Sequence, residues 1–215
     1  MTDPARTLIA ALLDRSGSME AIKSDSEGGF NSLIADQRTE PGEARVTLAQ
    51  FDTEYEVVYA NRPIADVGPL RLKPRGMTAL LDSIGRLITD VGAELSALPE
   101  LERPGKVIVV VVTDGLENSS VEWTVDAVSK AIKRQQDEYS WEFIFLGANM
   151  DAVEVGRSMG FAADRSMTFA PSAAGVGHSY RANSRLISRV RSAPAGARVE
   201  GFSDADREAA QGGRP

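Results

Sequence analysis

Six apolar residues in unbroken succession, at positions 8–13, constrain the fold of this 215-residue chain more than any other feature. A strand without polar alternation is typical of the centre of a parallel sheet that helices cover on both faces. Residues 106–113 read as a second buried strand, made almost wholly of β-branched residues. Each of the two segments is followed directly by a carboxylate, Asp14 and Asp114. We therefore predict two buried parallel strands with an aspartate at the C-terminal end of each.

The rest of the chain alternates between segments of helical and of strand periodicity. Helices are predicted over residues 20–37, 79–98, 124–138 and 151–159, and further strands over residues 46–51, 56–59, 142–146 and 166–169. The short interval between the strands at 46–51 and 56–59 indicates a hairpin, and hence an antiparallel edge strand. The predicted fold class is α/β: a doubly wound, mostly parallel central sheet with one antiparallel edge strand, flanked by helices.

The length of the chain suits one α/β domain. We expect a single domain over residues 1–191, with its core at about residues 6–170 and a closing helix at about residues 174–191. Residues 192–215 are rich in Ala, Gly, Pro and charged residues and can bury little apolar surface. A disordered tail is therefore predicted there.

The composition excludes several functional classes. The chain has no cysteine, which excludes disulfides, thiolate metal sites and thiol nucleophiles. A formal net charge of -7 argues against nucleic-acid binding, which depends on an excess of Lys and Arg. No apolar run approaches the roughly 20 residues of a membrane span, and residues 1–6 lack the basic start of a signal peptide. We expect a cytoplasmic protein that contacts neither nucleic acid nor membrane.

Side chains with oxygen donors gather around the two predicted strand ends. Asp14, Ser16 and Ser18 form the pattern Asp-x-Ser-x-Ser after the first strand, and Thr78 directly precedes a predicted helix. Ligands of open α/β sheets bind at the C-terminal ends of the strands, where Asp114 also lies. Hydroxyl and carboxylate oxygens are the donors that Mg2+ prefers. The sequence therefore predicts that these five side chains form one metal site.

Each of these side chains also has a purely structural interpretation. Asp14 and Ser16 could cap the helix that follows them, and Thr78 could cap its own helix. Asp114, which precedes Gly115, could belong to an ordinary turn. Their joint placement at one edge of the predicted sheet favours the metal site over a set of separate structural roles.

Several polar residues are predicted to surround the site without binding the metal. Asp82 is expected to stabilise the first turn of its helix through the helix dipole. Asp52 is expected to belong to the hairpin, and Asp151 to cap a helix. The candidates for contact with a partner are Glu117, Asn118 and Asn149.

The five predicted ligands match, without substitution, the metal-ion-dependent adhesion site (MIDAS) of the von Willebrand factor type A (vWA) domain. The sequence resembles this family over about residues 6–170, and bacterial and bacteriophage members in particular through residues 14–19, 28–31, 75–80, 113–115 and 141–149. The resemblance implies that Ser16 and Ser18 bind the metal directly and that Asp14 accepts hydrogen bonds from metal-bound water. It also implies that Thr78 and Asp114 alternate between direct and water-mediated contact.

The resemblance implies a non-catalytic, cytoplasmic adaptor or assembly protein that binds its partner through Mg2+, or through Mn2+. An Asp or Glu carboxylate of the partner protein would complete the coordination, because neutral hydroxyl ligands leave the cation with unsatisfied charge. Related members imply an AAA+ ATPase system or a phage/host assembly component as partner, with virion association in a phage-encoded protein. Two alternatives stay open: a structural or virion-associated subunit that retains the metal site, and a metal-dependent hydrolase, for which the site has few carboxylates.

Overall fold

The computed structural model describes residues 2–194 and 196–213, and its centre is a six-stranded sheet with the order β3-β2-β1-β4-β5-β6. The strands are β1 (Asp3–Asp14), β2 (Glu43–Phe51), β3 (Tyr55–Pro63), β4 (Pro104–Thr113), β5 (Glu142–Ala148) and β6 (Ser166–Phe169). Neighbouring strands are parallel except for β3, which pairs antiparallel with β2 at the edge of the sheet. The predicted α/β fold class, with its antiparallel edge strand, is confirmed.

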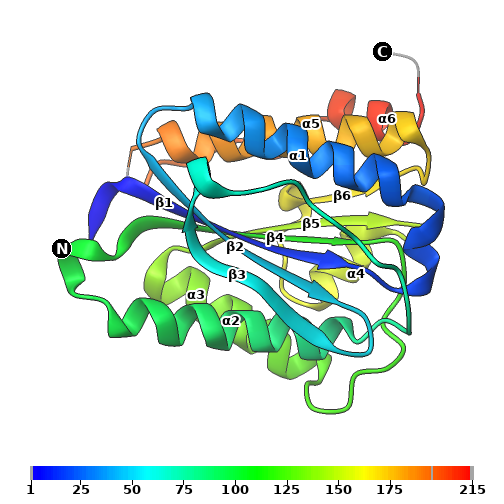
Figure 1. Cartoon of the computed structure of the whole chain (residues 1–215), viewed down its shortest axis with the longest axis horizontal. Helices are drawn as coiled ribbons and strands as arrows, with labels where there is room; N and C mark the ends of the chain where they lie inside the picture. The colour runs from blue at the N-terminus through cyan, green and yellow to red at the C-terminus, as the bar shows by residue number, and fades with distance from the viewer. Residues whose placement is uncertain (1, 195, 214–215) are drawn as a thin grey trace.

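Six α-helices of the described residues cover the two faces of this sheet (Figure 1). They are α1 (Lys23–Thr39), α2 (Leu80–Ala97), α3 (Val125–Tyr139), α4 (Ala152–Ser158), α5 (Ala173–Ser192) and α6 (Asp204–Ala210). Helices α1, α5 and α6 lie on one face, and α2 and α3 lie on the other. In the described part of the chain, no helix has both the length and the hydropathy that crossing a bilayer requires.

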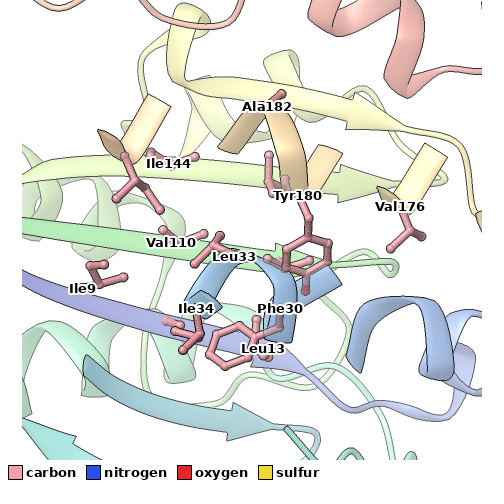
Figure 2. Packing of buried hydrophobic residues seen from close by; sticks show 14 of the residues in the cluster. Ile9, Leu13, Phe30, Leu33, Ile34, Val110, Ile144, Val176, Tyr180 and Ala182 are labelled. Atoms are coloured by element: carbon pink, nitrogen blue, oxygen red, sulfur yellow. The ribbon is translucent and has the colours of Figure 1, made fainter. Parts of the chain in front are cut away.

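Successive residues of β1 enter two buried clusters, one on each face of the sheet. Ile9 and Leu13 belong to the cluster beneath α1 and α5, whereas Leu8 and Leu12 belong to the cluster that includes α2 and α3. Figure 2 shows the first cluster, where Ile9 and Leu13 lie among side chains of α1, α5, β4 and β5. Residues 8–13 are each at most 2% exposed. The absence of polar alternation in this run therefore reflects a strand that is covered on both faces, as predicted.

The connections of β1 and β4, the two central strands, run in opposite directions across the sheet. The chain passes from β1 through α1 to β2 on one side, and from β4 through α3 to β5 on the other. Such a reversal opens a crevice at the C-terminal ends of the two strands. Leu13 of β1 pairs with Val112 of β4, so Asp14 and Asp114 leave the sheet close together.

The structure corrects the prediction of a disordered tail over residues 192–215. Within this segment, α6 begins with a capping box at Ser203. Phe202 and Ala210 are buried in the cluster beneath α1 and α5, and Ala170 N donates a hydrogen bond to Ala210 O at 2.8 Å. The prediction is wrong here because two apolar side chains of the segment do reach the core, and because hydrogen bonds from Ala170 N to Ala210 O and from Arg207 to Ser166 O attach the segment to β6 and the residue after it. Positions 195, 214 and 215 of the predicted tail lie outside the described residues.

Candidate metal centre

All five predicted ligands lie at one end of the sheet, at the C-terminal ends of β1 and β4. Asp14 is the last residue of β1, and Asp114 directly follows β4. Ser16 and Ser18 lie where the chain leaves β1 and enters the 3-10 turn before α1, and Thr78 lies two residues before α2. The fold thus brings together three segments that are far apart in the sequence.

Hydrogen bonds connect the oxygen atoms of this cluster. Asp14 Oδ1 accepts a hydrogen bond from Ser16 N at 2.6 Å, and Asp14 Oδ2 accepts one from the Thr113 hydroxyl at 2.6 Å. The hydroxyl oxygens of Ser16 and Ser18 lie 3.1 Å apart, and Ser18 Oγ donates to Asp114 Oδ1 at 2.6 Å. Asp14 therefore supports the loop and the neighbouring strand, while the other ligand oxygens approach one another.

Gly115 keeps space open next to the hydroxyls of Thr78 and Ser18. A Cβ atom on Gly115 would lie 3.1 Å from Thr78 Oγ1 and 3.7 Å from Ser18 Oγ. Both hydroxyls therefore lie beside the same point of the backbone, which places Thr78 in the cluster. A side chain at this position would press on the two oxygens, and this explains why a glycine follows Asp114.

The cluster opens to solvent at Ser18. Asp14, Ser16, Thr78 and Asp114 are each at most 4% exposed, whereas Ser18 is an exposed residue. A group that arrives from solvent therefore meets the exposed hydroxyl first, with the buried ligands behind it.

Two carboxylates, those of Asp14 and Asp114, lie in this poorly solvated place. Burial raises the pKa of Asp14 to about 6, although hydrogen bonds from the Thr113 hydroxyl and the Ser16 amide lower it. Burial also raises the pKa of Asp114, against the hydrogen bond from Ser18. Within the described ranges, neither carboxylate forms an ion pair with Lys, Arg or His. A divalent cation would supply the missing positive charge.

The donor set fits a hard divalent cation. It consists of two carboxylates and three hydroxyl groups, and all of these are oxygen donors. Over the part of the chain that the structure describes, no three His, Cys, Asp or Glu side chains are grouped so that they could hold a metal. A cation at this site would therefore depend on the seryl and threonyl hydroxyls, and it would keep part of its charge.

The residues predicted to contact a partner hold the ligand loops in place. Asn118 pairs with the backbone of Thr78 in both directions: its Oδ1 accepts from Thr78 N at 2.9 Å, and its N donates to Thr78 O at 3.1 Å. Asn149 Nδ2 donates to Asp114 O at 3.3 Å. Glu117 Oε2 accepts a hydrogen bond from the first-turn backbone of α2 at 2.8 Å. Their contact with a partner stays a prediction.

Three further aspartates have structural roles around the site. The carboxylate of Asp82, in the first turn of α2, accepts hydrogen bonds from the backbone N–H groups of residues 121–123 at 2.9, 2.9 and 2.7 Å. It thereby holds the loop after β4, which the sequence interpretation did not anticipate. Asp151 caps α4 by accepting two backbone hydrogen bonds at 3.0 Å, as predicted. Asp52 lies at the tip of the β2–β3 hairpin and is 2% exposed.

Thr113 is the residue at the site that sequence reasoning missed. Its hydroxyl donates to Asp14 from the adjacent strand, and it therefore fixes the carboxylate on which the Ser16 amide also depends. A threonine at the end of a run of valines is typical of any strand, because β-branched residues are enriched there. The one sequence feature that indicates a role for Thr113 is its position directly before Asp114, at the C-terminal end of a buried strand.

Neither a family model nor a curated protein matches this sequence, whereas solved structures match its fold. Proximal thread matrix protein 1 from the mussel byssus, with a zinc occupied MIDAS motif, aligns at TM-score 0.61 and 15% identity over 86% of this chain and 47% of that chain. The vWF domain of the type V pili tip protein Mfa5 from Porphyromonas gingivalis aligns at TM-score 0.63 and 8% identity, over 89% and 98% of the respective chains.

A third solved structure extends this likeness to another bacterium. The von Willebrand factor type A protein from Catenulispora acidiphila aligns at TM-score 0.55 and 17% identity, over 86% of this chain and 43% of that chain. The chain spans about half the length of the mussel proteins it matches. At these identities the likeness concerns the fold alone.

Proposed function

Because the chain has the von Willebrand factor type A fold, we propose that it is a non-catalytic module that binds a protein partner through a divalent cation. One observation carries the proposal. Two carboxylates and three hydroxyls from separate loops converge at the C-terminal ends of β1 and β4, and no cationic side chain of the described residues pairs with either carboxylate. The cluster is therefore complementary to a cation that the chain itself does not supply.

In this proposal, Ser16 and Ser18 hold the cation with their hydroxyls, and Thr78 and Asp114 complete the protein's share of the ligands. Asp14 takes a supporting role, because both of its oxygens already accept hydrogen bonds from Ser16 N and the Thr113 hydroxyl. Mg2+ is the cation we favour, and Mn2+ suits the same oxygen donors. A mussel protein of the same fold has a zinc occupied MIDAS motif, which supports a divalent cation at this place in the fold.

The partner we propose supplies an Asp or Glu carboxylate. With hydroxyls as most of its protein ligands, the bound cation would keep positive charge, and a carboxylate is the natural group to satisfy that charge. The exposed position of Ser18 gives such a group access from solvent. The sequence resemblance makes an AAA+ ATPase system or a phage/host assembly component our proposed source of this carboxylate, and the cytoplasm our proposed location.

The proposal of a non-catalytic role rests on the residues at the site. Metal-dependent hydrolases with two ions hold them with several carboxylates and histidines. Here Asp14 is fully buried, and Asp114 is the carboxylate of the described residues that accepts a hydrogen bond from Ser18, so we expect the cluster to bind one cation and leave a place for one acidic group.

Thermal unfolding with and without divalent cation tests the proposed function. Mg2+ or Mn2+ at a concentration of 100 times the dissociation constant should stabilise the folded chain by about 2.7 kcal/mol, which raises the Tm by about 2–4 °C per kcal/mol in a chain of this size. Ser16→Ala and Ser18→Ala should abolish the rise. Ser96→Ala is the matched control and should keep it, because Ser96 is an exposed serine in α2 whose hydroxyl donates to Ala93 O within the same helix. An equal Tm in Mg2+ and in EDTA for the natural sequence contradicts the proposal.

A further inference from the structure

The tip of the β2–β3 hairpin contacts both loops that carry hydroxyl ligands. On one side, Asp52 Oδ2 accepts a hydrogen bond from Arg15 Nε at 2.8 Å, and Arg15 directly precedes Ser16. On the other side, the same oxygen accepts a hydrogen bond from Arg75 Nε at 2.8 Å, three residues before Thr78. One carboxylate oxygen thus joins the two loops.

Hydrogen bonds to the backbone reinforce this contact on the Thr78 side. Ala79 N donates to Asp52 O at 2.9 Å, and Met77 N donates to Thr53 Oγ1 at 3.1 Å. The hairpin tip therefore holds the residues on both sides of Thr78, and the threonine between them has little freedom to move away from the cluster.

The two ligand loops also touch each other directly. Arg75 N donates to Arg15 O at 2.8 Å, and Gly17 N donates to Gly76 O at 3.3 Å. Gly76 has a φ of 67°, a left-handed conformation that favours glycine, and a Cβ atom there would lie 2.9 Å from Thr53 Oγ1. Glycine at this position thus allows the loop to pass close to the hairpin tip.

The ion pair between Asp52 and Arg15 at the hairpin tip is buried, whereas the Arg75 side chain is 55% exposed. Asp52 is 2% exposed and Arg15 is 6% exposed, and Arg15 also pairs with Glu56. Although burial acts in the opposite direction, hydrogen bonds from Arg75, the Glu54 amide and Arg15 hold the pKa of Asp52 below its usual range. Burying such a pair has a large desolvation cost. A role in holding two functional loops gives a reason for this cost.

We propose that the hairpin-tip cluster, formed by Arg15, Asp52, Thr53 and Arg75, sets the cation affinity of the metal site by holding the Ser16–Ser18 loop against the Thr78 loop. These are positioning residues, because their side chains hold the loops that carry the ligands and are not themselves proposed ligands of the cation. The proposal rests on the proposed function, since it requires a cation at the site. Without the cluster, the hydroxyls would have to be gathered when the cation binds, and that ordering lowers affinity.

Mn2+ titration of the full chain, with free Mn2+ followed by electron paramagnetic resonance, tests the cluster. Residues that support metal ligands change affinity by about 10- to 100-fold when they are replaced, and we expect a rise in the Mn2+ dissociation constant of that order in Asp52→Asn. Thr53→Val removes the acceptor for Met77 N at nearly constant volume and should also weaken Mn2+ binding. Thr53→Ser keeps the hydroxyl and should bind Mn2+ like the natural sequence.

Glu142→Gln is the matched control for the loss of an ion pair. Glu142 Oε2 pairs with Arg165 Nε at 3.1 Å at the start of β5, the opposite end of the sheet. The Arg165 side chain is 10% exposed against 7% for Arg15, and the Glu142 side chain is 34% exposed against 3% for Asp52. This variant should lower the Tm in EDTA and leave the Mn2+ dissociation constant unchanged. If Glu142→Gln weakens Mn2+ binding as much as Asp52→Asn does, the effect of both variants is general destabilisation, and the proposal is overturned.

The outcomes separate this proposal from the proposed function. If the natural sequence binds Mn2+ and both Asp52→Asn and Thr53→Val bind it equally well, the hairpin-tip cluster has no role in affinity and only this proposal is overturned. If the natural sequence binds no Mn2+, the metal site itself is overturned. Should Asp52→Asn not fold, the comparison of Thr53→Val with Thr53→Ser decides, because Thr53 is exposed and carries no charge.

Discussion

Asp14→Asn should stabilise the cation-free chain and weaken its response to cations. Asp14 is fully buried, and its pKa rises from the ordinary 3.8 to about 6 in the folded chain because of that burial. A difference of this size corresponds to about 3 kcal/mol of lost stability once the carboxylate is ionised in both the folded and unfolded states. Asparagine has a similar shape and carries no charge to desolvate.

The hydrogen bonds of the site limit the size of this gain. Ser16 N can still donate to the amide oxygen of asparagine. The Thr113 hydroxyl, 3.0 Å from Gly115 O, can turn to that carbonyl and accept from the new amide N–H group. Allowing about 1 kcal/mol for less favourable hydrogen bonds, we expect a net gain of about 1–2 kcal/mol, or about 2–8 °C in Tm.

The pH dependence has a definite sign. Because the folded-state pKa of Asp14 is raised, the folded state holds its proton to higher pH than the unfolded state, and this group's contribution to stability is lost as the pH rises from 3.8 to about 6. The difference in Tm between Asp14→Asn and the natural sequence should therefore be small at the acidic end of this range and reach its full size above pH 6. In saturating Mg2+ the natural sequence should have the higher Tm. Each tenfold weakening of Mg2+ binding in Asp14→Asn removes about 1.4 kcal/mol of the stabilisation that the cation gives.

Differential scanning calorimetry in EDTA and in Mg2+, across this pH range, measures both effects. Asp137→Asn is the matched control, since Asp137 is an exposed partner of Lys133 in α3 and its replacement should change stability by no more than about 0.5 kcal/mol. A lower Tm for Asp14→Asn than for the natural sequence in EDTA above pH 6 is the result that contradicts this prediction. It would mean that the hydrogen bonds of Asp14 outweigh the cost of its buried charge.

Three further changes test the structure around the site. Gly115→Ala would place a Cβ atom 3.1 Å from Thr78 Oγ1, so we expect several-fold weaker Mg2+ binding by isothermal titration calorimetry; an unchanged affinity counts against Thr78 as a ligand. Asp82→Asn leaves part of three backbone hydrogen bonds unmade and should cost about 1–3 kcal/mol in urea unfolding, and a neutral effect contradicts its role in holding the loop. Ser203→Ala removes the capping box of α6 and should cost about 1 kcal/mol by the same assay, whereas no change means that α6 adds nothing to stability.

The sequence was informative where one periodicity or one motif decides the structure. The unbroken run at residues 8–13 predicted a central strand, and its residues do face two separate clusters. The sequence also predicted that five side chains converge: Asp14, Ser16, Ser18, Thr78 and Asp114. In the structure, Ser18 bonds to Ser16 and Asp114, and the hydroxyls of Ser18 and Thr78 lie beside Gly115. Parallel strands make this possible, because their C-terminal ends meet at the same edge of the sheet.

The parts that could not be predicted depend on contacts between distant segments. The role of Arg15 becomes visible only when the hairpin tip places Asp52 and Glu56 beside it, since an arginine within the motif has no distinctive pattern of its own. Asp82 bonds to a loop about forty residues away, which helix-dipole reasoning does not consider. Helix α6 was missed because its attachment depends on a few buried side chains and on hydrogen bonds to β6 and the residue after it, which composition does not reveal.

An anomalous difference map from crystals of the full chain grown with MnCl2 shows whether the five-residue site binds a cation. We expect one strong manganese peak at the C-terminal ends of β1 and β4, in contact with the hydroxyls of Ser16 and Ser18, and its loss from crystals of Ser18→Ala. Absence of a peak at this place in well-ordered crystals, or manganese bound only to exposed carboxylates elsewhere on the chain, would mean that these residues do not form a metal site.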